Sequence, residues 1–182
     1  MTSHLFVITG PPGSGKTPII RELASMGFSG VAEPAREVIA EQRASGGSGL
    51  WERDRALFCR LMLSRALDDF ERHRTSGRPV FFDRALPDLV AYAEGSASII
   101  AEVRAAMDGR RYNDIVFFAP SWPEIYTTDE DRTATFEMAH EFGETIRGVY
   151  LDLGYTILEV PKATPAKRAA FVLDSAGVDT GK

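Results

Sequence analysis

A glycine-rich stretch near the start of the chain has the residue types and spacing of a phosphate-binding loop. It reads Gly-Pro-Pro-Gly-Ser-Gly-Lys-Thr over Gly10–Thr17 and fits the pattern G-x-x-x-x-G-K-[ST]. Glycines allow tight turns whose backbone N–H groups point inward around a phosphate chain. We expect the Lys16 ammonium to reach the β- and γ-phosphates of ATP, and the Thr17 hydroxyl to bind the Mg²⁺ that bridges them. The residues expected to bind the nucleotide are Gly10, Pro11, Pro12, Gly13, Ser14, Gly15, Lys16, Thr17 and Pro18.

The elements on either side of this loop are those that a phosphate loop requires. The apolar, β-rich run Leu5–Thr9 precedes it, and apolar residues recur at helical spacing over Thr17–Met26. The sequence therefore predicts strand, loop and helix in that order. Pro18 falls in the first helical turn, where a missing N–H is tolerated. It replaces the second hydroxyl residue that many phosphate loops offer to the α-phosphate.

The rest of the chain alternates between short apolar runs and longer helical patterns, which predicts an α/β fold. A parallel sheet with helices on both faces is the usual outcome of such an order. We expect one domain over residues 1–182, with a flexible loop at 44–49, a lid at 121–135 and a loose tail at 175–182. The segment 44–49 is either a simple flexible connection between helices or a flap over a substrate. The predicted strands are Leu5–Thr9, Phe28–Ala32, Pro79–Asp83, Asp114–Ala119 and Thr156–Val160.

Charged residues follow several of these strands, at the edge where parallel sheets bind ligands. Asp83 ends a Val-Phe-Phe-Asp run and is expected to face Mg²⁺, directly or through water; the alternative is a helix cap. Arg84 can clamp a phosphoryl group through its planar guanidinium. Glu33 can accept a proton from an acceptor hydroxyl, unless it is an ordinary acid at a helix start. Arg132 is the candidate lid arginine; the alternative is a solvated charge cluster at a helix start.

The overall composition fits a globular protein and excludes several classes of function. The chain has 182 residues, of which 44% are hydrophobic and 26% are charged. Its net charge of −5 argues against a nucleic-acid polymer or an anionic membrane as partner. A single cysteine, Cys59, excludes an internal disulfide. We see neither a signal peptide nor an apolar run of membrane-spanning length, so we expect a cytoplasmic protein.

Taken together, the motifs resemble a small bacterial kinase-like family of AAA-type ATPases. That family is similar to the kinase domain of bifunctional nicotinamide-ribose kinase regulators, and the likeness spans nearly the whole chain. It rests on Gly10–Thr17, Glu33–Glu37, Phe81–Arg84, Trp122–Tyr126 with Asp129 and Arg132, Leu153–Tyr155 and Val160-Pro161.

More distant resemblances concern individual positions. Glu-Pro after the second strand is similar to the deoxynucleoside kinases, in which the glutamate is the general base, and this implies that role for Glu33. Asp83-Arg84 resembles the thymidylate kinases, although the deoxynucleoside kinases carry Glu-Arg-Ser where this chain has Asp83-Arg84-Ala85. These resemblances imply a P-loop NTPase with a five-stranded parallel sheet of order 2-3-1-4-5. They also imply an adenine site near Lys162–Pro165.

The function predicted from these features is transfer of the ATP γ-phosphoryl group to a small-molecule acceptor, nucleoside- or nucleotide-like. Either Glu33 or Asp83 would orient the acceptor hydroxyl, while Arg84 and Arg132 neutralise charge. The alternative is a regulatory ATPase or nucleotide-dependent switch that acts on a protein partner. The identity of the acceptor and the oligomeric state are left open by the sequence.

Overall fold

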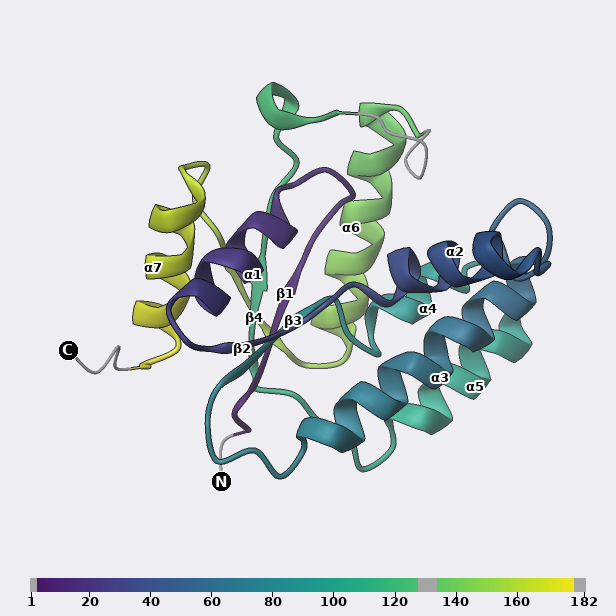
Figure 1. Cartoon of the computed structure of the whole chain (residues 1–182), viewed down its shortest axis with the longest axis horizontal. Helices are drawn as coiled ribbons and strands as arrows, with labels where there is room; N and C mark the ends of the chain where they lie inside the picture. Colours follow the sequence, from purple (N-terminus) through teal and green to yellow (C-terminus); the bar gives the residue numbers. More distant parts are fainter. Residues whose placement is uncertain (1–2, 128–133, 179–182) are drawn as a thin grey trace.

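The computed structural model describes residues 3–127 and 134–178, and helices and strands alternate along them (Figure 1). The strands are β1 Leu5–Thr9, β2 Ser29–Val31, β3 Val80–Asp83, β4 Ile115–Phe118 and β5 Thr156–Glu159. The helices are α1 Lys16–Ser25, α2 Pro34–Ser45, α3 Arg55–His73, α4 Asp88–Tyr92, α5 Ala97–Met107, α6 Phe136–Asp152 and α7 Pro165–Ser175, with a 3₁₀ turn, η1, at Pro123–Ile125.

All five strands form one parallel sheet in the order β2-β3-β1-β4-β5. The predicted fold class and strand order are thereby confirmed. Because successive side chains of a strand point to opposite faces, β1 divides its residues between two cores. Phe6 and Ile8 pack with residues of α1 and α7, whereas Leu5 and Val7 belong to a larger core built with α2 to α6. Figure 1 shows α1 and α7 on one side of the sheet and α3, α5 and α6 on the other.

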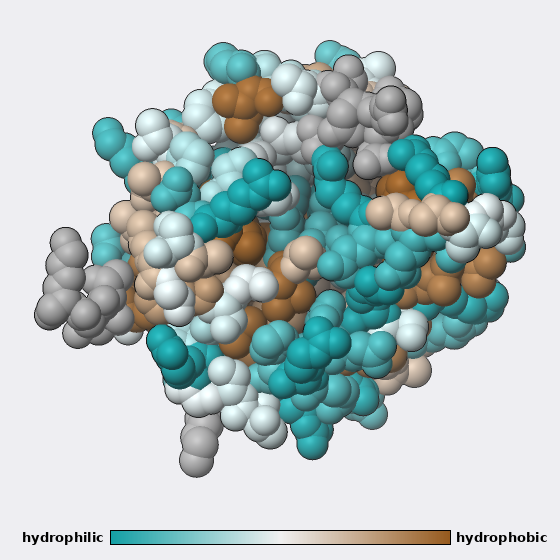
Figure 2. All heavy atoms as spheres, viewed as in Figure 1, coloured by the Kyte–Doolittle hydropathy of each residue, from teal (hydrophilic) through white to brown (hydrophobic). Residues whose placement is uncertain are grey.

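The middle of the sheet is apolar on both faces, as expected for parallel strands covered by helices. Every residue of β1 and β3 is buried, whereas the edge strands β2 and β5 carry exposed residues. On the face of the molecule drawn in Figure 2, hydrophilic side chains predominate and apolar ones come through in separate patches. Within the described residues, no helix combines the length and the apolar character that crossing a bilayer requires.

Three segments that the sequence marks as irregular can be located in part. The segment 44–49 contains the end of α2, where Gly46 adopts a left-handed φ of 68°, and the Gly49 N–H donates to Gln42 Oε1 over 2.9 Å. The segment 121–135 contains η1, and its residues 128–133 lie outside the described part. Helix α7 ends at Ser175, and residues 179–182 are likewise outside it. The mobility of all three segments stays a prediction.

The start of helix α3 is set by a side-chain cap. The helix begins at Arg55, because the Asp54 carboxylate accepts a hydrogen bond from the Leu57 N–H (2.9 Å). Trp51 then lies in a turn, from which its indole reaches Phe58 and Tyr92 with ring centroids about 6 Å away.

Candidate active site

The loop between β1 and α1 wraps around the Lys16 ammonium. Lys16 Nζ donates to the carbonyl oxygens of Pro11 (2.8 Å) and Gly10 (3.2 Å), and Lys16 is 5% exposed. Gly10 has φ 134°, and a Cβ there would lie 2.2 Å from the Ala119 carbonyl oxygen. Only glycine fits at this point, where the loop passes close to the end of β4.

Asp83, the acid at the end of β3, lies directly beside this loop. The parallel pairing of β1 and β3 sets Asp83 next to Ile8, and Thr17 Oγ1 donates to Asp83 Oδ2 over 2.8 Å. Asp83 is 2% exposed, and its other oxygen, Oδ1, has no hydrogen-bond partner among the described residues. A carboxylate oxygen without a partner, beside a threonine hydroxyl, is the oxygen-donor set that Mg²⁺ prefers. These two side chains therefore fit the metal that the phosphate loop implies.

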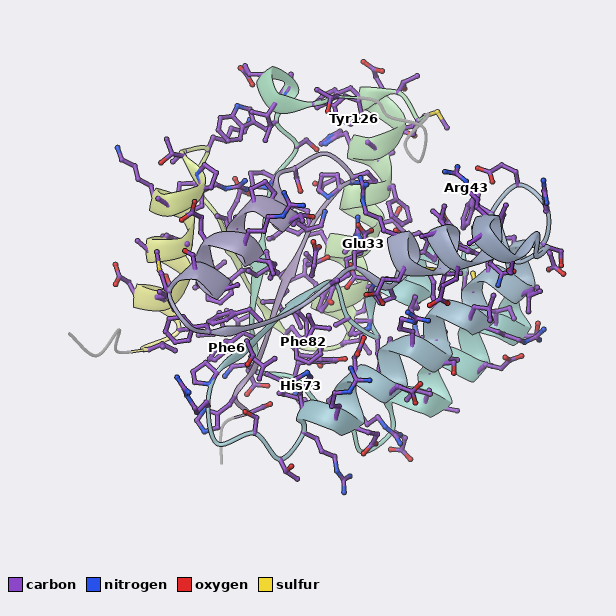
Figure 3. All side chains as sticks on the ribbon, viewed as in Figure 1. Phe6, Glu33, Arg43, His73, Phe82 and Tyr126 are labelled. Atoms are coloured by element: carbon purple, nitrogen blue, oxygen red, sulfur yellow. The ribbon has the colours of Figure 1, made fainter. Side chains whose placement is uncertain are left out.

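Glu33 stands at the start of α2, near the centre of the molecule (Figure 3). Its Oε1 accepts a hydrogen bond from Arg84 Nε (2.8 Å) and a longer one from the Tyr92 hydroxyl (3.4 Å). Its Oε2 lies 3.8 Å from Arg36 Nε. The side chain is 15% exposed, so it is mostly enclosed yet still reachable from the solvent side.

Arg84 is turned toward buried carboxylates by an unusual backbone conformation. Its φ of 69° is rare for a residue other than glycine. The guanidinium is 3% exposed and bonds Glu33 through Nε and Asp88 Oδ1 through Nη1 (3.1 Å), while Nη2 finds no partner among the described residues. Arg84 therefore holds Glu33 in place; its predicted contact with a phosphoryl group stays a prediction.

Asp88 connects this arginine to the core. It is fully buried, and its oxygens accept hydrogen bonds from the Thr9 hydroxyl, Arg84, the Ala85 N–H (2.9 Å) and the Tyr150 hydroxyl (2.5 Å). These donors belong to β1, to the segment after β3 and to α6. Asp88 thus joins three parts of the chain at the carboxyl edge of the sheet.

The close charges shift one another's pKa values. Burial, together with the nearby Arg84 charge, lowers the pKa of Lys16 to about 8, although the carboxylates around it oppose the shift. Burial raises the pKa of Asp83 to about 6, although the Lys16 charge opposes this. Burial alone would raise the pKa of Glu33, but Arg84 and Lys16 outweigh it and hold that pKa below its usual value. Glu33 is therefore ionised at neutral pH.

A cavity of about 1170 Å³ opens from this cluster in two directions. One end follows the phosphate loop to the segment before α7, and the other end passes Glu33 into a chamber between α2, α3, α4 and α6. The first end is lined by Pro12, Gly13, Gly15, Lys16, Thr17, Pro18, Trp122, Ile125, Ala163, Thr164, Pro165 and Arg168. The chamber is lined by Glu33, Ala35, Arg36, Ile39, Arg43, Leu50, Trp51, Glu52, Phe58, Tyr92, Met138, Ala139 and Phe142. In Figure 3, Arg43 lies toward the far end of α2 from Glu33.

The structure thus brings Lys16, Thr17, Glu33, Asp83 and Arg84 together, and their predicted roles stay predictions. Arg132 lies outside the described residues. Three other arginines pair with acids and do not line the cavity: Arg110 with Glu71, Arg111 with Asp114, and Arg147 with Glu159.

Three residues of the site are missed by sequence reasoning: Asp88, Tyr92 and Arg168. Arg84 and Asp88 are four residues apart, but Arg84 lies before α4 with a left-handed φ, so the rule for side-chain pairs on a helix does not predict their contact.

The sheet order and the phosphate loop define a P-loop NTPase with a kinase-like fold. A family model described as an AAA domain matches residues 5–168, and the chain belongs to that family. No curated protein matches the sequence.

Several solved structures share this fold at low sequence identity. NadR protein in complex with NR is 20% identical with a TM-score of 0.76, and the match covers 100% of this chain and 54% of NadR. The chain thus spans about half the length of NadR. Deoxyadenosine kinase from M. mycoides, with dCMP and dCDP bound, is 14% identical with a TM-score of 0.58, over 95% of this chain and 98% of that one. Thymidylate kinase from Ehrlichia chaffeensis is 16% identical with a TM-score of 0.58, over 94% and 98%.

The raised pKa of Asp83 predicts that Asp83→Asn stabilises the ligand-free protein at neutral pH. A carboxyl group whose pKa rises from 3.8 to about 6 on folding stabilises the fold below the lower value and loses that contribution as the pH rises through the higher one. Asparagine at this position carries no charge, so the variant does not bear the cost of burying a carboxylate at neutral pH. We expect its free energy of unfolding to exceed that of the original protein by about 1–2 kcal/mol at pH 7, with the gain fading toward pH 4. Urea unfolding across this pH range measures it.

Asp114→Asn is the control, because it also replaces a carboxylate, and the exposed ion pair of Asp114 with Arg111 should contribute less than about 1 kcal/mol. A loss of stability in Asp83→Asn at pH 7 would contradict the account, since Asp83 would then be a stabilising group.

Asp88→Asn should have the opposite effect. The amide nitrogen of asparagine accepts no hydrogen bond, so it cannot replace the oxygen to which the Ala85 N–H and the Tyr150 hydroxyl donate. The neutral amide also leaves Arg84 short of negative charge. We expect a loss of about 3 kcal/mol in the free energy of unfolding at pH 7. Chemical denaturation measures it beside the same Asp114→Asn control. A change below about 0.5 kcal/mol, as for surface substitutions, would show that this network does not hold the site together.

Proposed function

We propose that this protein is an ATP-dependent phosphotransferase that passes the γ-phosphoryl group to a hydroxyl of a small acceptor, nucleoside- or nucleotide-like. The observation that carries the proposal is a single cavity that is lined both by the phosphate loop and by the chamber residues, Glu33 among them. Its volume exceeds the roughly 300–1,000 Å³ of a pocket for one drug-sized ligand, so it has room for two. A nucleotide at the phosphate loop leaves the chamber between α2 and α6 for a second molecule.

The chamber has the character of a small-molecule site. Its walls are largely apolar and aromatic, with Phe58, Tyr92 and Phe142 among them. Tyr92 and Phe142 meet edge to face with ring centroids 4.9 Å apart, which gives a stiff wall against which a flat ring can pack. Arg36, Arg43 and Glu52 supply polar groups around it. A protein that only hydrolyses ATP has no need for such a chamber beside its phosphate loop.

The residues divide the work of transfer between them. Lys16 and the loop N–H groups hold the donor phosphates, and Thr17 and Asp83 would hold Mg²⁺, which neutralises charge on the β- and γ-phosphates when bound. The acceptor hydroxyl oxygen bonds to the γ-phosphorus while the bond from that phosphorus to the β–γ bridging oxygen breaks, and ADP leaves. We assign the hydroxyl proton to Glu33 rather than to Asp83, because Glu33 lines the cavity and is ionised, whereas Asp83 does not line it.

The low pKa of Glu33 suits a residue that orients the hydroxyl more than one that removes its proton early. This agrees with the chemistry of phosphoryl transfer, in which the transition state is loose and positioning contributes most of the catalysis. The names of the similar structures point to the acceptors to test first: nucleosides, deoxynucleosides, their monophosphates and NR.

To test the function, the protein is incubated with Mg·ATP and each of these candidate acceptors. ADP and the phosphorylated acceptor are then measured by mass spectrometry. We expect one class of acceptor to raise ADP formation well above the rate with water alone and to gain one phosphoryl group.

Lys16→Ala should lower the rate of ADP formation about 10²–10³-fold, because it removes a charge aimed at the transferred group. If ADP and free phosphate form at the same rate with every acceptor, the protein is an ATPase. An unchanged rate in Lys16→Ala would refute the site itself.

Glu33→Gln tests the assignment of the proton acceptor. We expect kcat for transfer to fall about 10²–10⁴-fold, while KM for ATP changes little, because the amide cannot take the proton but leaves the phosphate loop intact. Glu37→Gln is the matched control, since Glu37 lies on the same helix and pairs with Arg65 away from the cavity. A Glu33→Gln protein with normal kcat but a lowered melting temperature would assign Glu33 a structural role only.

A further inference from the structure

Arg168 on α7, far from the phosphate loop in the sequence, contacts that loop in space. Its Nη1 donates to the Ser14 carbonyl (2.9 Å) and to the Gly15 carbonyl (3.3 Å). The residue is 2% exposed and lines the donor end of the cavity, where its guanidinium carbon lies 5.7 Å from the centroid of the Trp122 ring. A Cβ on Gly15 would come within 2.6 Å of Nη1, so the close approach depends on glycine.

This contact fixes the direction of two N–H groups. The described peptide bonds are all trans, so the carbonyl and the N–H of each peptide unit point in opposite directions. Holding the Ser14 carbonyl aims the Gly15 N–H the other way, and holding the Gly15 carbonyl does the same for the Lys16 N–H. In a phosphate loop, that other side is the inside, where N–H groups cradle the phosphates.

The arginine is poorly satisfied in its own right. Its Nε and Nη2 have no hydrogen-bond partner among the described residues, and burial lowers its pKa to about 10. A buried cation with only one bonded nitrogen opposes folding. Such a group calls for an explanation other than stability of the ligand-free protein.

Pro18 makes the aimed N–H groups more important. Proline has no N–H, and its side chain has no hydroxyl, so the first turn of α1 offers fewer donors to a nucleotide. Anion binding then depends more on the N–H groups just before it.

We propose that Arg168 is a positioning residue for the polyphosphate of the donor nucleotide, which it serves by orienting the Gly15 and Lys16 N–H groups. This rests on the proposed function, in that the ligand is taken to be ATP. The role is indirect: Arg168 acts on the loop, and the loop acts on the phosphates.

Calorimetric titration of Arg168→Met with Mg·ATP and with inorganic tripolyphosphate tests this role. We expect both ligands to bind about tenfold more weakly or worse, since hydrogen bonds from charged groups are at stake. Lys167→Met is the matched control: it removes the same charge from the neighbouring exposed position and should change both affinities less than about threefold. The melting temperature of ligand-free Arg168→Met should be equal to or above that of the original protein, which a merely structural arginine would not allow.

Two further variants sharpen the result. Arg168→Lys keeps the charge, but the lysine side chain ends one bond short of the Nη1 position. This variant should therefore also bind both ligands more weakly. Adding Pro18→Thr to Arg168→Met restores an N–H and a hydroxyl near the phosphates and should recover part of the lost affinity.

Several results would overturn the inference. If Lys167→Met weakens the binding of both ligands as much as Arg168→Met does, Arg168 acts only through its long-range charge. If Arg168→Met loses ATP binding but binds tripolyphosphate normally, Arg168 serves the base or the ribose instead. Unchanged affinities in Arg168→Met and Arg168→Lys would refute this inference while leaving the proposed function intact. If the original protein binds neither ligand, the proposed function fails together with it.

Discussion

The site depends on a set of charges buried where the carboxyl ends of β1 and β3 meet. Lys16 and Arg84 are positive and Asp83 and Asp88 are negative, and the mostly enclosed Glu33 joins them, with Arg36 at 3.8 Å on its other side. Taking such charges out of water is costly unless each has partners, and Arg84, Thr17 and Asp88 provide most of them. The Asp83 oxygen that has no partner among the described residues makes a place for a cation.

The polar atoms without partners gather at this site. Of the five buried side-chain atoms that lack a hydrogen bond among the described residues, four belong to Asp83, Arg84 and Arg168. Native proteins leave few such atoms, and those that remain often mark function. The protein thus gives up stability around the phosphate loop, while the apolar cores on both faces of the sheet maintain the fold. A bound metal would supply the partner that Asp83 Oδ1 lacks among the described residues.

The sequence predicts the fold well, because its signals are local. Apolar runs reveal the strands, and the glycine spacing of Gly10–Thr17 reveals the loop between β1 and α1. The carboxyl-end rule then groups Glu33, Asp83 and Arg84 correctly at one edge. It cannot show that Arg84 bonds Glu33 or that Asp88 meets Tyr150, because these contacts depend on strand order and on how helices from distant parts of the chain pack. The approach of Arg168 to Ser14 is hidden for the same reason.

The measurement that tests the central claim most directly is a crystal structure of the protein with Mg²⁺ and a non-hydrolysable ATP analogue. The account predicts that the phosphates lie in the loop Gly10–Thr17 and that the metal lies beside Thr17 and Asp83. It also predicts that the terminal phosphate faces the end of the cavity where Glu33 opens to the chamber. A nucleotide whose phosphates lie elsewhere, or whose terminal phosphate is walled off from Glu33, would contradict it.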